Sequence, residues 1–220
     1  MSTPADPFAA TLARLPLFPL PNVVLFPHAL LPLHIFEDRY RAMVRDILSG
    51  ERYLAMGFIN PDANPDEERP AVAAIAGVGE VVMAHELPDG RFNLIVRGRA
   101  RVRIDRELAS ELPYRVVAAT LLPDTVASDA NELRDAEQAL RALIGQLADA
   151  IPDGSEPLRE VVGGAQTPTE LADVIASELI PNAALRQQLL ETLDVGKRIE
   201  RIAAEVVAMT ARLAAPGVIN

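Results

Sequence analysis

The stretch LPLFPLPNVVLFPHALLPLHIF, residues 15–36, decides how the first half of this chain folds. It is apolar enough to suggest a membrane-spanning helix. Prolines interrupt it at Pro16, Pro19, Pro21, Pro27 and Pro32. Each proline inside a helix removes a backbone hydrogen bond and clashes with the preceding turn. The stretch therefore predicts short strands and turns, and argues against a membrane span.

Beyond this stretch, short apolar and β-branched segments continue to residue 122, with Pro, Gly, Asn and Asp between them. Such an alternation of segments and breakers is typical of strands joined by turns. Strands are predicted at residues 15–17, 23–26, 31–35, 53–59, 72–84, 92–96, 100–105 and 114–122. One helix is predicted among them, over residues 37–49, because its apolar residues have helical spacing and Gly50 follows it.

Two features mark the segment around residues 87–104. Asp89 and Gly90 predict a tight hairpin turn, since glycine accepts a positive φ. After it, apolar and basic residues alternate, which predicts one buried and one wet strand face. The apolar set is Phe92, Leu94, Val96, Val102 and Ile104, and the basic set is Arg97, Arg99, Arg101 and Arg103. Gly98 is expected to bend or bulge the run.

After Pro123 the apolar spacing becomes helical. Asp129 and Glu132 predict a capping box for a helix that ends near residue 151. The sequence TPTE, residues 167–170, predicts the start of a second helix that ends near residue 179. A third helix is predicted over residues 183–193, and a fourth begins with Asp194 as its N-cap.

The last predicted helix carries a heptad-like seam of Val195, Ile199, Ile202, Val206, Met209 and Leu213. Such a seam either packs inside its own bundle or binds a partner helix. Together these patterns predict an α+β chain. A β-rich domain is expected over residues 1–122 and a helical bundle over residues 123–220.

The residues and motifs that usually support catalysis are either absent or unsuitably placed. There is no cysteine, no phosphate-binding loop and no G-x-S-x-G turn. The one lysine, Lys197, is expected on the surface of a helix. His34 and Glu37 straddle a predicted strand end and helix start, so they do not share a helical face that could hold a metal. We expect no enzymatic activity, no metal and no cofactor.

The charge of the chain limits its partners. The formal net charge is -10, and a field of that sign repels phosphate groups. Neither nucleic acid nor a membrane is therefore an expected partner. The first positive charge is Arg14, so the N-terminus lacks the basic segment of a secretory signal, and we expect a cytoplasmic protein.

Five segments, taken in order, resemble the N-terminal substrate-binding domain of Lon proteases, in its free-standing bacterial version. They are residues 15–44, 77–82, 87–104, 167–179 and 185–202. The resemblance implies a twisted β pseudo-barrel with one inserted helix, followed by a helical bundle. In Lon proteases this region helps to recognise unfolded or tagged polypeptides, and separate domains hydrolyse ATP and cut.

The resemblance implies a non-catalytic module that binds unfolded or apolar polypeptide segments, as an adaptor in protein quality control with a protease or chaperone as a further partner. The binding residues that we single out are Phe18, Phe26, Met83 and Phe92, each of which could equally belong to the core. Two alternatives stay open. One is anion or acidic-peptide binding at Arg97, Arg99, Arg101 and Arg103, and the other is a pure scaffold.

Overall fold

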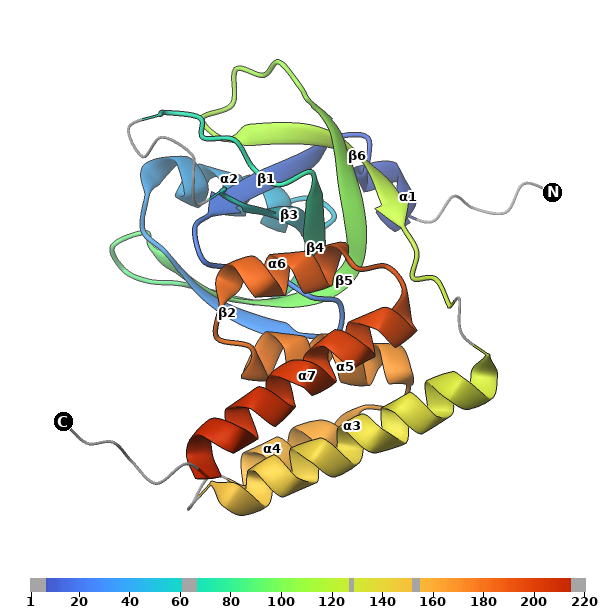
Figure 1. Cartoon of the computed structure of the whole chain (residues 1–220). Helices are drawn as coiled ribbons and strands as arrows, with labels where there is room; N and C mark the ends of the chain where they lie inside the picture. Colours follow the sequence, from blue (N-terminus) through green and yellow to red (C-terminus); the bar gives the residue numbers. More distant parts are fainter. Residues whose placement is uncertain (1–6, 61–66, 127–128, 152–154, 215–220) are drawn as a thin grey trace. The chain divides into compact units, whose positions relative to one another are not determined.

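The computed structural model describes residues 7–60, 67–126, 129–151 and 155–214 (Figure 1). The chain divides into two compact units. The β-rich unit consists of Met1–Pro123 and Asn182–Leu190, and the helical unit consists of Asp124–Pro181 and Glu191–Asn220. A mixed sheet with an inserted helix is thus followed by a helical region, which confirms the predicted α+β class.

The β-rich unit is built on six strands: β1 (Leu15–Leu20), β2 (Leu30–Ile35), β3 (Tyr53–Phe58), β4 (Ile75–Glu86), β5 (Phe92–Glu107) and β6 (Arg115–Leu122). Their order is β2-β5-β4-β3-β1-β6, and β5 also pairs with β6. That extra pairing nearly closes the sheet into a ring and leaves β2 at its edge. Only β1 and β3 are parallel among these pairs. The predicted pseudo-barrel is confirmed.

Helices α1 (Pro7–Thr11) and α2 (Asp38–Leu48) belong to the same unit. The predicted helix after the first strands is α2, which buries Met43 and Val44 in a cluster that also contains Phe18 and Phe92. A second cluster, which includes Leu17 and Val102, forms separately. The hairpin turn is also confirmed, since Gly90 has a φ of 79°.

The prediction of a strand at residues 23–26 is wrong. These residues have no ladder partners, although Leu25 and Phe26 are buried. Their backbone instead crosses closely over Gly77 and Gly98: a Cβ on Gly77 would lie 1.9 Å from the Leu25 carbonyl oxygen, and one on Gly98 would lie 1.8 Å from that of Phe26. The apolar run therefore marks a crossing segment that only glycine allows so near the sheet.

Strand β5 contains the bulge that Gly98 suggested. Gly98 lies opposite Gly79 and Ala100 lies opposite Val78, so Arg99 has no residue opposite it. The bulge exchanges the two faces of the strand, and consequently Val96 and Val102 pack in different clusters. The prediction of one continuous wet face is wrong for this reason.

Beyond the bulge, Arg101 is only 2% exposed. Its Nε donates to the carbonyl oxygen of Leu190 at 3.0 Å, and its guanidinium lies 5.9 Å from the centroid of the Phe26 ring. Leu190 belongs to α6 (Ala183–Glu191), whose Gln187 side chain also donates to the Ile75 carbonyl oxygen at 2.9 Å. A helix far along the sequence thus covers part of the sheet.

The helical unit contains α3 (Ala130–Ala150), α4 (Ser155–Gly164), α5 (Pro168–Leu179) and α7 (Val195–Ala214). The predicted caps of three of them are confirmed. Asp129 and Glu132 form a capping box, Thr167 accepts from the Glu170 amide at 3.1 Å, and Asp194 accepts from the Lys197 amide at 3.0 Å. No helix in the described parts of the chain is both long enough and apolar enough to cross a membrane.

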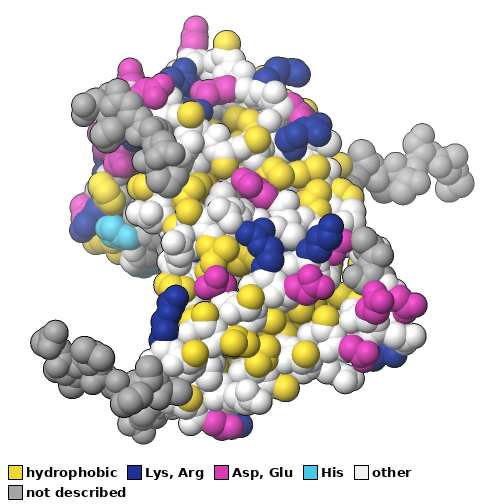
Figure 2. Space-filling view, viewed as in Figure 1, with side chains coloured by type: hydrophobic (Ala, Val, Ile, Leu, Met, Phe, Trp, Pro, Cys, Tyr) yellow, Lys and Arg dark blue, Asp and Glu magenta, His cyan; other side chains and the backbone are white. Residues whose placement is uncertain are grey.

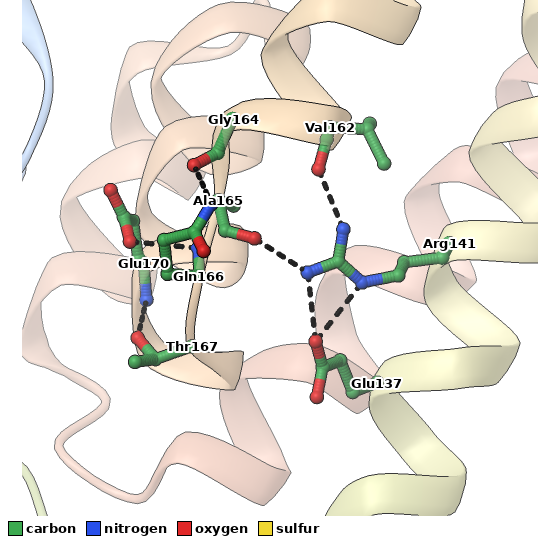
Figure 3. A network of polar contacts seen from close by, with 8 residues as sticks. All are labelled: Glu137, Arg141, Val162, Gly164, Ala165, Gln166, Thr167 and Glu170. Atoms are coloured by element: carbon green, nitrogen blue, oxygen red, sulfur yellow. Dashed lines mark hydrogen bonds and ion pairs between the residues drawn. The ribbon is translucent and has the colours of Figure 1, made fainter.

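Helix α4 was not predicted. Its C-terminal carbonyl groups meet the guanidinium of Arg141 from α3, which donates to the oxygens of Val162 at 2.6 Å and Ala165 at 2.9 Å (Figure 3). Glu137 holds the same guanidinium at 2.8 Å. A cation at a helix C-terminus satisfies carbonyl groups that have no amide partner further along the helix. This cap comes from a distant residue, so the local sequence does not display it.

The seam of α7 packs inside the helical unit over most of its length, where Val195, Ile199, Ile202 and Val206 are buried. Near its C-terminal end Leu213 is exposed. Arg198, next to this seam, is fully buried and lies 3.1 Å from Asp173 and 3.0 Å from Asp124.

Candidate functional site

The outer face of β2, β5 and β4 carries side chains in rows, because directly opposite residues of paired strands point to the same side of a sheet. The central row is apolar and contains Pro32, Ile95 and Met83. One flanking row is polar and contains His34, Asn93 and His85. The other contains Leu30, Arg97 and Glu80.

A second bulge enlarges the apolar row. Val81 lies opposite Val96 and Met83 lies opposite Ile95, so Val82 is an extra residue in β4. Met83 is 57% exposed and its neighbour Val82 is also exposed. Two consecutive strand residues would normally point to opposite faces, and the bulge lets both reach solvent.

These strands surround an apolar hollow of about 430 Å³, defined by Pro32, Leu33, His34, Met83, His85, Asn93, Leu94 and Ile95. Figure 2 shows one face of the molecule, on which hydrophobic side chains lie among basic and acidic ones over the β-rich unit, with histidine in cyan at its margin. An exposed apolar surface with a polar rim is typical of an interaction site.

Strand β2 forms one wall of this hollow and pairs, among the described residues, with β5 alone. Its other edge therefore presents backbone groups that no described strand uses. Pro32 lacks an N–H, which suits an edge strand. Leu30, the first residue of β2, and Phe36, which directly follows the strand, are exposed. The strand offers both hydrogen-bonding groups and apolar contacts to another chain.

The polar rim is held by a short chain of hydrogen bonds. Arg91 approaches Nε2 of His34 at 3.3 Å, and Nδ1 of His34 lies 2.7 Å from the Asn93 oxygen. A guanidinium can only donate, so Nε2 accepts and Nδ1 carries the proton. Arg91 also bonds to Asp89, and these hydrogen bonds hold the pKa of Asp89 below its usual range. The rim thus holds the His34 ring in a fixed orientation.

A second hollow of about 550 Å³ lies elsewhere in the β-rich unit, lined in part by Tyr40, Tyr114 and Arg115. Its arginines are already paired, among them Arg39 with Glu37 and Arg115 with Glu107, both at 2.8 Å. Burial, followed by the hydrogen bond that Tyr114 donates to Asp46, raises the pKa of Tyr114. This hollow is larger but polar, and it suits an apolar segment less well.

The residues singled out from the sequence do not gather at one place. Phe18, Phe26 and Phe92 are buried in the interior, whereas Met83 lies at the centre of the exposed apolar row. The buried three form no accessible surface, so the candidate site retains only Met83 of this set.

The arginine set is also divided. Arg97 and Arg99 are exposed, and Arg103 is exposed and bonded to Asp105 at 3.0 Å. Arg101 is buried, as described above. Pro32 and Ile95 were not among the predicted site residues. Each stands between two apolar residues, so the sequence shows no alternation there, and it does not show the pairing register that brings the two together.

The nearly closed sheet, its inserted helix and the helical region after it define a class of domain that solved structures share. The N-terminal domain of a Mycobacterium avium complex Lon protease has a TM-score of 0.65 and 20% identity, over 90% of this chain and 98% of that one. A Lon N-terminal domain protein from Xanthomonas campestris has a TM-score of 0.61 and 23% identity, over 87% and 97%. At these identities the likeness shows the fold.

Residues 14–207 match the family described as the ATP-dependent protease La (LON) substrate-binding domain, and the chain belongs to this family. The Lon protease of Dictyoglomus thermophilum is 30% identical over 191 residues, which are 86% of this chain and 23% of that protein. The Lon protease of Xanthomonas oryzae pv. oryzae is 29% identical, over 84% and 22%. The chain therefore spans less than a quarter of the length of these relatives, and the predicted resemblance is confirmed.

Proposed function

We propose that this chain binds apolar segments of other polypeptides at the hollow on β2, β5 and β4, without catalysing a reaction on them. The observation that carries the proposal is the exposed apolar row centred on Met83, beside an edge strand whose outer backbone groups no described strand uses. Membership of a substrate-binding domain family supports it.

The mechanism is the addition of an extended segment to the free edge of β2. Backbone hydrogen bonds to β2 supply affinity that does not depend on sequence, and every second side chain of the segment points to the outer face. An apolar side chain there would cover Pro32 and shield Met83 from water. Full burial of one such side chain stabilises a complex by about 1.5–3 kcal/mol.

This mechanism selects unfolded or partly unfolded clients. A folded protein hides its apolar segments and pairs its own strands, whereas an unfolded chain leaves both available. A role as an adaptor in protein quality control follows, with a protease or chaperone as the further partner, because the relatives of this chain carry the name Lon protease.

The test is photo-crosslinking to a destabilised variant of a small globular protein and to its folded parent. The wild-type chain should capture the unfolded client and not the folded one. Met83→Asp should weaken capture about tenfold or more, since it places a charge where an apolar contact forms. Val207→Asp changes an apolar residue on α7 that is also about half exposed, and it should have no effect. Equal capture of both clients, or by both variants, would overturn the proposal.

Strand addition has its own test. Two versions of a bound peptide, each N-methylated at one of the two alternating sets of amides, should differ, because only one set faces β2. One version should lose binding and the other keep it. Retention of binding by both versions would show that the peptide does not pair with the edge, and the chain would then be better described as a scaffold.

A further inference from the structure

Arg97 stands out among the cations around the apolar row. Among the described residues it makes no ion pair, although it is exposed and lies opposite Glu80. The carboxylate of Glu80 turns to Arg99 instead, at 3.7 Å. The other cations near this face are closely paired, Arg91 with Asp89 at 2.6 Å and Arg45 with Glu86 at 2.9 Å.

The position of Arg97 is fixed relative to the apolar row. It follows Ile95 by two residues on β5, so the two side chains point to the same face about 7 Å apart along the strand. A segment added to β2 would continue the same rows. Its residue in line with Pro32 would meet the apolar row, and its residue in line with Leu30 would meet the row of Arg97.

The distance between an added strand and β5 determines which side chain of the added segment could reach Arg97. An added strand lies two strand spacings from β5, about 10 Å away. An arginine and a glutamate that extend toward each other over Leu30 can span that distance, and a pair of this kind is partly shielded by the leucine. A lysine or arginine in the same place would meet Arg97 with a like charge.

We propose that the hollow prefers an extended polypeptide segment in which a glutamate lies two residues from the apolar side chain that contacts the apolar row. Arg97 forms an ion pair with the carboxylate of this glutamate. The inference rests on the proposed function of the hollow. It narrows the anionic alternative from four arginines to one, because Arg101 is buried and Arg99 and Arg103 face Glu80 and Asp105.

The test uses nine-residue fluorescent peptides with one central leucine and a single variable position two residues before or after it. Anisotropy titrations would compare Glu, Gln and Lys there. For one of the two orders, Glu should bind about two- to fivefold tighter than Gln at low salt, which is the range of an exposed ion pair. The preference should shrink as salt rises.

Arg97→Gln should remove the difference between the Glu and Gln peptides, and Arg97→Glu should make the Lys peptide the tighter one. Arg103→Gln, a matched change on the same strand, should leave the preference intact. If the peptides bind in a Met83-dependent way with no preference, or with one that survives Arg97→Gln, this inference is overturned and the proposed function stands. If no peptide binds, the proposed function is overturned with it.

Discussion

Arg97 in the β-rich unit and Arg198 in the helical unit each lie beside a row of apolar residues, but they differ in burial and in charge pairing. Arg198 is fully buried next to the seam of α7 and contacts two carboxylates, Asp173 and Asp124. Arg97 is exposed next to the row of Ile95 and Met83, and no ion pair reaches it within the described residues. A covered apolar pattern requires its charges to be paired, whereas an accessible one can leave a charge for a partner.

The largest expected effect is the loss of stability when the buried ion pair of Arg198 in the helical unit is broken. Asp173→Ala leaves the buried guanidinium of Arg198 with one carboxylate fewer, and breaking a buried pair in this way costs about 3–5 kcal/mol. Urea unfolding would measure the loss. Asp149→Ala removes an exposed partner of Arg159 and should change stability by less than about 1 kcal/mol. Equal effects would mean that burial does not distinguish the two pairs.

The next effect concerns the crossing segment over the sheet. Gly77→Ala places a methyl group against the Leu25 carbonyl, so the backbone must shift, and overpacking of this kind costs about 1–3 kcal/mol. Thermal unfolding would report it as a lower midpoint. Gly145→Ala is the matched control, because no atom beyond the nearby backbone of its own helix, α3, lies within 4 Å of the added Cβ. This change should stabilise by about 0.5–1 kcal/mol.

Tyr114 provides a prediction that depends on pH. Its pKa is raised by burial and by the bond to Asp46, so the folded state favours the neutral phenol. That contribution is fully present below the ordinary tyrosine pKa of about 10 and is lost as pH rises from there through the raised pKa of the folded state. Tyr114→Phe should cost about 0.5–1.5 kcal/mol at pH 7. Above pH 10 it should lose less stability than the wild type, and parallel profiles would contradict this account.

The smallest expected change in stability concerns Met83 in the exposed apolar row of the β-rich unit. Met83→Ser should change stability by no more than about 0.5 kcal/mol, because the side chain is already largely in water. Ile202→Ala, in the covered seam, should cost about 2–5 kcal/mol. The same Met83→Ser variant should bind unfolded clients more weakly. A large loss of stability in Met83→Ser would place this residue in the core rather than in a binding site.

The division of the chain at residue 122 stays a prediction with a direct test. Arg101 and the Ile75 carbonyl bond to residues of α6, which lies well beyond that point. A fragment of residues 1–122 should therefore be less stable than the same fragment supplied with a peptide of residues 182–190. Identical unfolding curves would show that the β-rich part folds without α6.

Local patterns predicted local structure well. Helix α2, the hairpin at Gly90 and the caps at Asp129, Thr167 and Asp194 each depend on residues within one turn of one another. Helix α4 was missed because Arg141, which caps it, comes from another helix. The strand predicted at residues 23–26 failed because burial without hydrogen-bonded pairing gives the same apolar pattern.

The sequence by itself determined the class of fold, the family resemblance and which residues alternate, since periodicity records the faces of single strands and helices. Only the tertiary structure decided which faces are covered. The bulges at Arg99 and Val82 exchange or widen faces, and pairing of β2 with β5 and β4 assembles the hollow around Met83. Register and cover depend on residues far apart along the chain, and no local pattern encodes them.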